Sequence, residues 1–439
     1  MTDPRRIAFD ILRQVDEDDA YANLALADAL REARLSARDA ALATELVSGT
    51  LRLRGSYDPI IDALITRELD PPVRDLLRLG AHQLLSMRVP DHAAISETVR
   101  LTKSTVGHRP SGFVNAVLRK LAVHSLDHWL RRVAPDPVAD LHGYLSVVYS
   151  HPRWIVAELL AAVSDPEQIE PLLAANNARP SVHLAALKMP PEELAAQVGG
   201  TATPTSPIGV ELLGGHPGAV DAVRAGLARV QDAGSQLVAL TLAEAPLEGS
   251  DQRWLDLCAG PGGKAALLAE LASRRGAHLT ANEVSVHRAG LVAQALASYD
   301  VDVVVGDGRS GPWQPGSFDR VLVDAPCSGL GALRRRPEAR WRKRPSDLDQ
   351  LVELQGELLA AALEAVRPGG LVAYATCSPV LSETVGVVER LLVARPDARL
   401  VQIANAVGES PHMAGAVQMW PHLHGTDAMF VALLTRDSL

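Results

Sequence analysis

Residues 255–264 read LDLCAGPGGK, an apolar strand followed by a glycine-rich turn and the start of a helix. Such a turn lets a ligand approach the backbone closely, and the helix N-terminus offers it amide donors. A nucleoside triphosphate loop needs glycine six residues before the lysine and Ser or Thr directly after it, but Cys258 and Ala265 stand there. The glycines are also too tightly spaced for the dinucleotide pattern GxGxxG. The loop therefore predicts a site for another kind of ligand.

Two acidic residues end the strands that follow this loop. Glu283 is the last residue of the strand HLTANE, 20 residues after Gly263. A carboxylate at this place can accept hydrogen bonds from both ribose hydroxyls of a nucleoside. Asp307 ends the third strand, in VVVGDGR, and could meet the base of the same nucleoside. Either acid alone is more often a helix cap or a turn former. Together with the glycine loop they predict a nucleoside cofactor without a long phosphate tail, a description that S-adenosylmethionine fits.

Strands and helices alternate from about residue 236 onward. The strands WLDLC, HLTANE, VDVVVGD, FDRVLVDAP and LVAYATCS are separated by helical runs such as KAALLAELAS and HRAGLVAQALAS. Alternating βα units predict a parallel sheet wrapped by helices, with ligands at the carboxyl ends of the strands. The tail at 416–434, AVQMWPHLHGTDAMFVALL, reads as a hairpin instead. We therefore expect a Rossmann-like α/β domain over residues 236–439.

The first 140 residues contain no alternating run and read as a helical bundle. One buried helical stripe shows the spacing 0, 3, 4, 7, 8, 11 and comprises Val73, Leu76, Leu77, Gly80, Ala81 and Leu84. Residues 141–235 differ, because helical stretches are followed by short strand-like runs at 181–187 and 208–214. The expected architecture is multidomain: an all-α bundle over 1–140, a small α/β connector over 141–235 and the α/β domain.

The composition is that of a soluble globular protein that is too long for a single core. The chain has 439 residues, of which 47% are apolar and 22% are charged. No window reaches the roughly 18 apolar residues of a membrane span, and the N-terminus carries acids where a signal peptide needs an apolar core. The three cysteines, at 258, 327 and 377, are too few and too widely spaced for a disulfide framework or a zinc site. We expect a cytoplasmic monomer without a metal ion and away from membranes.

The net charge of −9 argues mildly against nucleic acid as a partner, but the distribution of cations favours it. Residues 100–132 hold seven cations and one acid, and residues 331–344 hold seven more cations and one acid. Two such clusters on an acidic chain are typical of phosphate-binding surfaces, although each alone could be a solvated helix face. The first cluster comprises Arg100, Lys103, Arg109, Arg119, Lys120, Arg131 and Arg132.

The motifs LDLCAGPGGK, ANEVSVHR, VGDGR, VDAPCSGLG, RRRPEARW and AYATCSP occur in this order and resemble those of the bacterial RsmB/Sun (Fmu) RNA cytosine-C5 methyltransferases. The N-terminal segments RIAFDILRQV, LVSGTLRLRGSYDPII and FVNAVLRKL resemble the NusB-like helical domain of that family. The resemblance covers essentially the whole chain. Departures from the family pattern are Gly260 in place of Ala, Ala265 in place of Thr and Thr384 in place of Asn.

The resemblance implies a class I methyltransferase domain that uses S-adenosylmethionine to methylate carbon 5 of a cytosine in small-subunit (16S) rRNA. It implies that Cys377 adds to carbon 6 of the base and that Cys327 helps to release the product. Asp324, three residues before Cys327, is placed to assist as an acid. Position alone leaves the roles of the two thiols open, because DNA cytosine methyltransferases use the cysteine of the Pro-Cys motif as nucleophile. Cys258 reads as a structural residue of the cofactor loop.

Three sets of residues follow from these interpretations. The catalytic residues are Cys377, Cys327 and Asp324. The cofactor-binding residues are Cys258, Ala259, Gly260, Pro261, Gly262, Gly263, Lys264, Glu283, Asp307 and Asp324. The RNA-binding residues, in the segment that directly follows the first cysteine motif, are Arg334, Arg335, Arg336, Arg340, Arg342, Lys343 and Arg344.

Two other functions remain open on the sequence. A NusB-like RNA-binding or assembly factor could keep a cofactor domain that no longer catalyses, although intact Asp324, Cys327 and Cys377 argue against this. A DNA cytosine methyltransferase is disfavoured by the ATCSP cysteine and by the NusB-like region. The thiols themselves could be two buried small apolar residues, since free cysteine often packs in that way.

Overall fold

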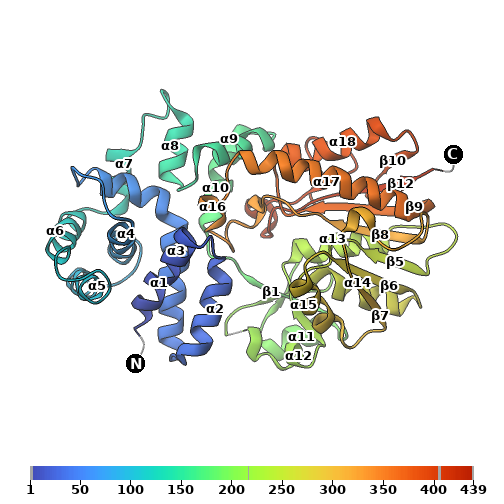
Figure 1. Ribbon diagram of the computed structural model, residues 1–439, viewed down its shortest axis with the longest axis horizontal. Helices are drawn as coiled ribbons and strands as arrows, with labels where there is room; N and C mark the ends of the chain where they lie inside the picture. The colour runs from blue at the N-terminus through green and yellow to red at the C-terminus, as the bar shows by residue number, and fades with distance from the viewer. Residues whose placement is uncertain (1–2, 216, 404–406, 438–439) are drawn as a thin grey trace. The chain divides into compact units, whose positions relative to one another are not determined.

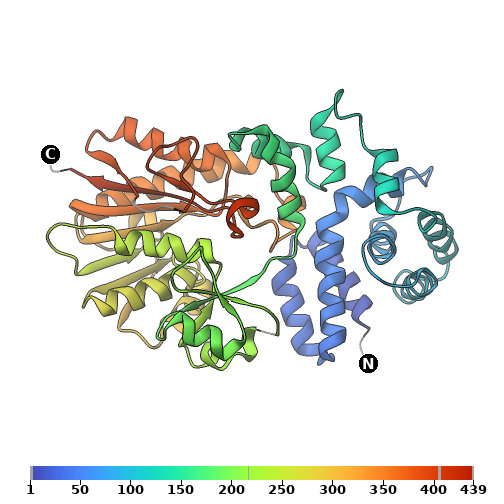
Figure 2. The same ribbon diagram turned by 180° about the vertical axis from the view of Figure 1, so that it is seen from behind.

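The computed structural model describes residues 3–215, 217–403 and 407–437 (Figures 1 and 2). The chain divides into two compact units. Unit 1 comprises Met1–Leu160, Glu167–Ala178 and Leu333–Lys343, and unit 2 comprises Ala161–Pro166, Arg179–Ala332 and Arg344–Leu439. Neither unit is a single continuous stretch. Among the described residues, no helix is both long and apolar enough to cross a membrane.

Unit 1 is all-helical, as the sequence predicts for the first 140 residues. Its helices are α1 (Pro4–Glu17), α2 (Ala22–Ala33), α3 (Ala37–Asp62), α4 (Pro71–Leu85), α5 (Asp91–Thr105), α6 (Ser111–Leu121), α7 (Leu126–Val133), α8 (Leu141–Val148), most of α9 (Arg153–Ala162), α10 (Ile169–Asn177) and the short α16 (Ala339–Arg342). The helix ends have local causes. Asp3 and Ser36 cap α1 and α3 by accepting a backbone N–H, and Pro71 stands at the first position of α4. The predicted apolar stripe of α4 is buried at Val73, Leu76, Leu77 and Ala81.

Unit 2 begins with a small antiparallel sheet of strand order β2-β3-β1-β4. Its elements are β1 (Val182–Ala186), α11 (Pro191–Val198), β2 (Thr201–Ala202), β3 (Gly209–Leu212), α12 (Asp221–Arg224) and β4 (Ala228–Val230). The strands match the runs expected at 181–187 and 208–214. The connector expected over 141–235 is nevertheless not one compact body in this division, because its first helices group with unit 1 and its sheet with unit 2.

The large sheet of unit 2 has the strand order β10-β12-β9-β8-β5-β6-β7. Its strands are β5 (Arg253–Asp256), β6 (His278–Glu283), β7 (Val301–Val305), β8 (Phe318–Asp324), β9 (Val366–Thr376), β10 (Ala398–Val401) and β12 (Phe430–Arg436), with β11 (Val417–Gln418) beside β12. The strands β5 to β9 run parallel, whereas β12 pairs antiparallel with both β9 and β10. The expected tail hairpin is the short β11–β12 pair. The strand order reverses at β5, which is where such sheets bind ligands at the carboxyl ends of their strands.

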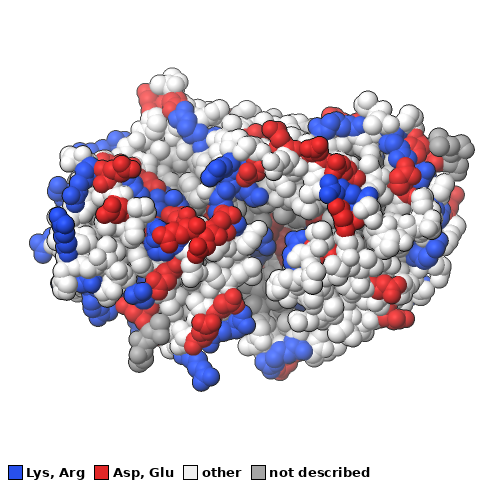
Figure 3. Space-filling model, in the orientation of Figure 1, with Lys and Arg blue, Asp and Glu red and all other residues white. Residues whose placement is uncertain are grey.

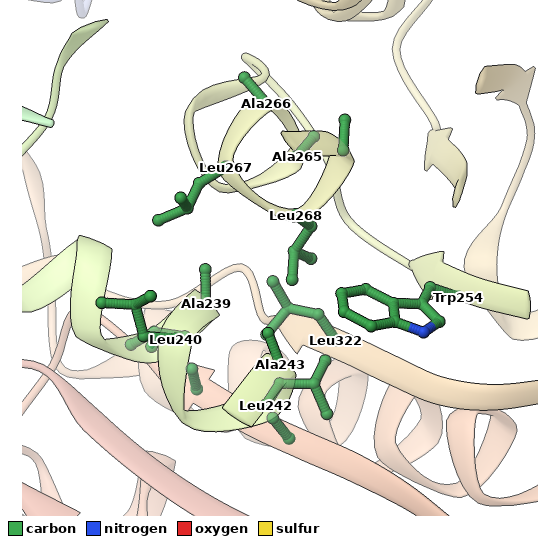
Figure 4. Close-up of a cluster of buried hydrophobic side chains, with 14 of the residues drawn as sticks. Ala239, Leu240, Leu242, Ala243, Trp254, Ala265, Ala266, Leu267, Leu268 and Leu322 are labelled. Atoms are coloured by element: carbon green, nitrogen blue, oxygen red, sulfur yellow. The ribbon is translucent and has the colours of Figure 1, made fainter. Parts of the chain in front are cut away.

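Helices cover both faces of this sheet. Alternate side chains of the strands point to opposite faces, so Trp254 and Leu322 join the apolar cluster with α13 (Ala233–Glu244), α14 (Gly263–Arg274) and α15 (Val286–Leu296). Figure 4 shows this cluster around Leu268 of α14. Leu255 and Val321 face the other way and pack with α17 (Ser346–Ala365) and α18 (Val385–Ala394). The two buried layers fix the strands and therefore the loops at their carboxyl ends. This is the Rossmann-like fold that the sequence predicts.

Candidate active site

The glycine-rich loop connects β5 to α14 at the carboxyl edge of the sheet. Gly262 is the N-cap residue of α14 and has a φ of 102°, a conformation that side chains rarely adopt. A Cβ atom there would lie 2.6 Å from the Cβ of Ala295 on α15, so this close approach also requires glycine. Beside Gly263, in contrast, no atom lies within 4 Å of a Cβ position. The first turn of α14 therefore has room for a ligand beside its unpaired amide groups.

Cys258 is partly buried, and Asp256, two residues before it, is fully buried. Cys258 packs against the apolar cluster of the α17 face, and burial, followed by the charge of Asp256, raises the pKa of its thiol. Asp256, the last residue of β5, is fully buried, and its oxygens accept no hydrogen bond of ordinary geometry, although the Cys258 amide lies nearby. Burial first, and then the charge of Asp324, raise the pKa of Asp256 to about 8. Asp256 is absent from the predicted site residues, and the signal it leaves in the sequence is an acid between an apolar strand and a glycine loop.

The predicted carboxylate of Glu283 reaches back to the glycine loop. Its Oε2 accepts a hydrogen bond from the amide of Gly260 at 3.0 Å. Its Oε1 accepts from the amide of Ser285 at 2.8 Å and from the guanidinium of Arg288 at 2.6 Å. The side chain is only 1% exposed. The loop after β5 and the end of β6 are thus adjacent, as a shared cofactor site requires.

The second predicted acid, Asp307, lies just after β7 and begins the short 3-10 turn Gly308–Ser310. Its oxygens accept from the backbone amide of Arg309 at 3.0 Å and from the same residue's guanidinium at 2.6 Å. These bonds, the side-chain one first, lower the pKa of Asp307. A nucleoside base that contacts Asp307 would therefore share its carboxylate with Arg309.

The two cysteine motifs meet at the ends of the neighbouring strands β8 and β9. The Sγ atoms of Cys327 and Cys377 lie 3.3 Å apart, and both residues are partly buried. The loops are further joined at Gly331, whose amide donates to the carbonyl of Cys377 at 2.9 Å. The hydrogen bond with Cys377, followed by burial and the charges of Cys377 and Glu383, raises the pKa of Cys327. One of the two thiols is thus held in its neutral form beside the other.

A cation of the glycine loop pairs with the acid of the first cysteine motif. The Nζ atom of Lys264, in the first turn of α14, is 2.9 Å from Oδ2 of Asp324, the last residue of β8. Burial alone would lower the pKa of Lys264, but the charge and hydrogen bond of Asp324, followed by the charge of Cys377, raise it. Lys264, predicted as a cofactor-binding residue of the loop, is therefore also an ammonium group whose charge interacts with Asp324 and Cys377.

A second acid that the sequence analysis missed is Glu383, which lies after β9 and is fully buried. Its carboxylate accepts hydrogen bonds from Ser328 and Ser378, the residues directly after the two site cysteines. In the sequence, Glu383 could have been noticed as an acid five residues after Ser378 of the ATCSP motif and just before the apolar run of α18.

The predicted RNA-binding segment does not present all its cations to solvent. Arg336 and Arg344 are exposed, Arg335, Arg342 and Lys343 are partly buried, and Arg334 is 7% exposed. Arg340 is fully buried within unit 1, where it donates to the carbonyls of residues 52, 150 and 176 and to the side chain of Asn177. The prediction that Arg340 contacts RNA is therefore wrong, because its guanidinium is used inside the protein. Arg342 pairs with Asp19 on unit 1.

The first cationic cluster, at 100–132, is on the surface of unit 1. All seven of its Lys and Arg residues are exposed, and Figure 3 shows such side chains along the left edge, over α6. Arg100 pairs with Glu97 and Asp3, and the guanidinium of Arg132 lies 5.5 Å from the ring of Trp129. This surface is available to a polyanion.

Comparison with known proteins shows the family to which this chain belongs. The model of the 16S rRNA methyltransferase RsmB/F family matches residues 243–435, and the NusB family model matches residues 2–123. The ribosomal RNA small subunit methyltransferase B of Sodalis glossinidius is 32% identical, with 93% of this chain and 92% of the relative covered. The chain belongs to the RsmB/Sun family of S-adenosylmethionine-dependent rRNA methyltransferases.

Other relatives cover the same length. The methyltransferase B of Pectobacterium carotovorum is 32% identical over 99% of this chain and 98% of the relative. A protein of Mycobacterium tuberculosis named "Putative methyltransferase Rv1407" is 50% identical over 98% of this chain and 96% of its own. The RsmB/Sun family assignment therefore rests on the full chain, including the NusB domain.

Solved structures agree with the fold. The crystal structure of PH0851 superposes with a TM-score of 0.81 at 23% identity and covers 99% of both chains. The structure of NSun6 from Pyrococcus horikoshii with SFG has a TM-score of 0.58 at 18% identity, and covers 66% of this chain and 99% of its own. Both confirm the Rossmann-like domain of an RsmB/Sun family member.

Proposed function

We propose that this RsmB/Sun family protein methylates carbon 5 of a cytosine in 16S rRNA through a covalent bond between Cys377 and carbon 6 of the base. The observation that carries the proposal is the 3.3 Å separation of the Cys327 and Cys377 sulfur atoms at neighbouring strand ends. Two buried structural cysteines would have no need of an adjacent lysine and aspartate. The arrangement supports a site in which both thiols reach the same ring.

Carbon 5 of cytosine is a poor nucleophile, so it must be activated before it accepts a methyl group. Addition of a thiolate to carbon 6 moves the electron pair of the ring double bond toward carbon 5, which then attacks the methyl group. Afterwards a base removes the proton from carbon 5, the double bond re-forms and the sulfur leaves carbon 6. One thiol performs the addition, and a second group close by can assist the release.

The environment favours Cys377 for the addition and Cys327 for the release. The Lys264 ammonium near Cys377 favours the thiolate form. The raised pKa of Cys327 makes its neutral thiol a poor nucleophile, and its thiolate, once the thiol proton has passed to solvent, is the stronger base that can accept the carbon 5 proton. Asp324, beside Lys264, can donate or share a proton with the polar edge of the base. These roles agree with those that the family motifs imply.

The residues at the glycine loop fit S-adenosylmethionine. The amide groups of the first turn of α14 can donate hydrogen bonds to a carboxylate. The buried oxygens of Asp256 can accept hydrogen bonds from an ammonium group, and Glu283 can accept them from ribose hydroxyls. Asp307 would lie toward the base. When bound, the cofactor supplies the methyl group as an electrophile. The loop itself orients the ligand and excludes water from it.

We propose that exposed cations bind the phosphates of the RNA. The residues available for this are Arg336 and Arg344 after the first cysteine motif, and the cluster at 100–132 on unit 1. The target base must be unpaired or flipped to reach thiols that are partly buried. Such a substrate would place the protein in the cytoplasm with the assembling small subunit.

The proposal is tested by rRNA methylation in cells and by adduct formation with purified variants. Bisulfite sequencing of 16S rRNA from cells with and without the gene should reveal one cytosine that loses its methylation. Purified Cys377→Ala should form no covalent adduct, whereas Cys327→Ala should keep RNA attached to Cys377 through denaturing electrophoresis. An unchanged rRNA profile would favour the assembly factor. An adduct that maps to Cys327 in the Cys377→Ala variant would reverse the two roles.

A further inference from the structure

One buried carboxylate connects the two cysteine turns. Cys327 and Cys377 are each followed by a serine, and both serines bind Glu383. The amide of Ser328 donates to Oε1 of Glu383 at 2.7 Å, and the Ser328 hydroxyl donates to Oε2 at 2.5 Å. The hydroxyl of Ser378 donates to the same Oε2 at 2.6 Å. The two turns are therefore tied to a single side chain.

The remaining contacts strengthen this arrangement. Nε2 of Gln355, on α17, donates to Oε1 of Glu383 at 3.0 Å and to the carbonyl of Pro326 at 2.8 Å. The hydroxyl of Tyr374, on β9, donates to the backbone carbonyl of Glu383 at 2.6 Å. The Ser378 hydroxyl also accepts from the amide of Val380 at 3.2 Å, so its own proton points to the carboxylate. The carboxylate of Glu383 thus accepts four hydrogen bonds and donates none.

Stability alone does not account for a buried carboxylate at this position. Burial removes a carboxylate from water at a large free-energy cost, which its hydrogen bonds only offset. Glu383 does not cap α18 either, because its side chain bonds only the two serines and Gln355 in the part of the chain that the structure describes. Every one of those bonds positions residues 326–328 or Ser378. The contacts are directed at the two thiol-bearing turns.

We propose that Glu383 is a positioning residue that holds Cys327 and Cys377 at the separation needed for one thiol to leave the base with help from the other. The inference rests on the proposed adduct mechanism. Without this tie Cys377 can still add to the base, because its own strand end remains. The turn of Cys327 then loses its fixed distance, so release becomes the slow step.

The experiment measures addition and release separately. Glu383→Gln keeps the size of the side chain but replaces one carboxylate oxygen, which accepts hydrogen bonds from the serines, by an NH2 group, which can only donate. We expect the cofactor dissociation constant to stay close to wild type and the midpoint of thermal unfolding to fall by a few degrees, because the amide meets buried serine donors. Turnover should fall about 100-fold, a typical loss when reacting groups are misplaced by about an ångström. The fraction of RNA bonded to Cys377 after a single turnover should rise several-fold at the same time.

Controls separate this role from a general loss of structure. Glu389→Gln changes an exposed acid on the following helix and should leave turnover and adduct fraction unchanged. If Glu383→Gln does not fold, the double variant Ser328→Ala, Ser378→Ala removes the donors instead and should show the same accumulation of adduct. Adduct and product that fall in equal proportion would show a merely structural role and overturn the proposal, as would wild-type turnover.

The proposed function fails in a different way. If Cys327→Ala, in an otherwise unchanged chain, traps no RNA, the adduct mechanism itself is wrong. If Cys327→Ala traps RNA on Cys377 and Glu383→Gln does not accumulate the adduct, only the role of Glu383 is wrong.

Discussion

The side-chain nitrogen of Lys264 lies 2.9 Å from a carboxylate oxygen of Asp324, and this ion pair joins the glycine loop to the strand that leads into the first cysteine motif. Only 11% of the lysine side chain is exposed. Since Asp324 and then Cys377 contribute to the raised pKa of Lys264, the ammonium group interacts with the proposed nucleophile as well as with the aspartate. The glycine loop and the first cysteine motif, which we propose bind the cofactor and the base, therefore share an ion pair.

Lys264→Met should make Cys377 less reactive. Loss of the ammonium group raises the pKa of the neighbouring thiol, and one pKa unit corresponds to roughly tenfold less thiolate at neutral pH. The rate at which iodoacetamide alkylates Cys377 should fall by about that factor, measured by peptide mass spectrometry. Because the pKa of Lys264 is raised, its effect should persist through pH 7–9 in the wild type. Lys103→Met, at an exposed position on α5, is the matched control, and equal alkylation rates in all three proteins would contradict the assignment.

Asp256→Asn should change how stability depends on pH. The pKa of Asp256 is raised from 3.8 in the unfolded chain to about 8 in the folded protein. Between these values the native state binds a proton that the unfolded state does not, so the free energy of unfolding falls as pH rises, by up to about 1.4 kcal/mol per pH unit. The variant should lose this slope between pH 5 and 8 in urea titrations.

Asp349→Asn, which removes an exposed carboxylate on α17, should keep the wild-type slope. A wild-type protein without any cofactor whose stability is flat over this range would show that Asp256 titrates at its ordinary pKa.

Arg340→Met should destabilise unit 1. Methionine fills a similar volume, but the three carbonyls and the amide oxygen that Arg340 binds lose their donor in a buried place. Burial, followed by the charge of Arg52, already lowers the pKa of Arg340 to about 9, so its positive charge is less favourable there than in water. The loss of the hydrogen bonds still dominates, and we expect a decrease of about 3 kcal/mol in the free energy of unfolding. Denaturant titration of Arg340→Met and of the exposed Arg336→Met gives the comparison. Equal stability of the two variants would contradict the burial of Arg340.

Arg336→Glu combined with Arg344→Glu should weaken RNA binding without loss of stability. Each phosphate contact releases a counterion, so removal of two contacts should reduce the slope of log Kd against log salt by about 1.4 for single-stranded RNA. Binding of labelled rRNA fragments at several salt concentrations measures this slope. Arg253→Glu with Arg275→Glu makes the same change of net charge at the amino end of the sheet. A slope that falls equally in both double variants would indicate a general charge effect and no site.

The sequence predicts most of the architecture because its signals are local. Helical periodicity identifies α4, and the βα alternation identifies the parallel strands whose ends bring Cys327 and Cys377 together. Asp256 and Glu383 are missing from the predicted site because one acid within an apolar run has many structural explanations. What distinguishes them is burial, which depends on helices that are distant in sequence.

The basic segment shows why charge alone misleads. Arginine is rarely buried, so the seven cations within residues 331–344 predict an exposed surface. Arg340 is buried because backbone carbonyls of α3 and of residues near 150 and 176 converge on it, and the carbonyl of Arg52 is 288 positions away in the chain. No local sequence pattern predicts that such distant carbonyl groups bind Arg340.

That convergence has a consequence for the order in which the protein can form during synthesis. All helices of unit 1 except α16 are complete by Ala178, but the segment Leu333–Lys343, which carries α16 and Arg340, emerges from the ribosome much later. At ordinary translation speeds the delay is roughly ten to thirty seconds. Until then the hydrogen bonds of Arg340 cannot form, and the other helices of unit 1 lack α16 while the first strands of the large sheet are translated. The N-terminal part of this rRNA methyltransferase family member is thus finished only when most of its C-terminal part has been translated.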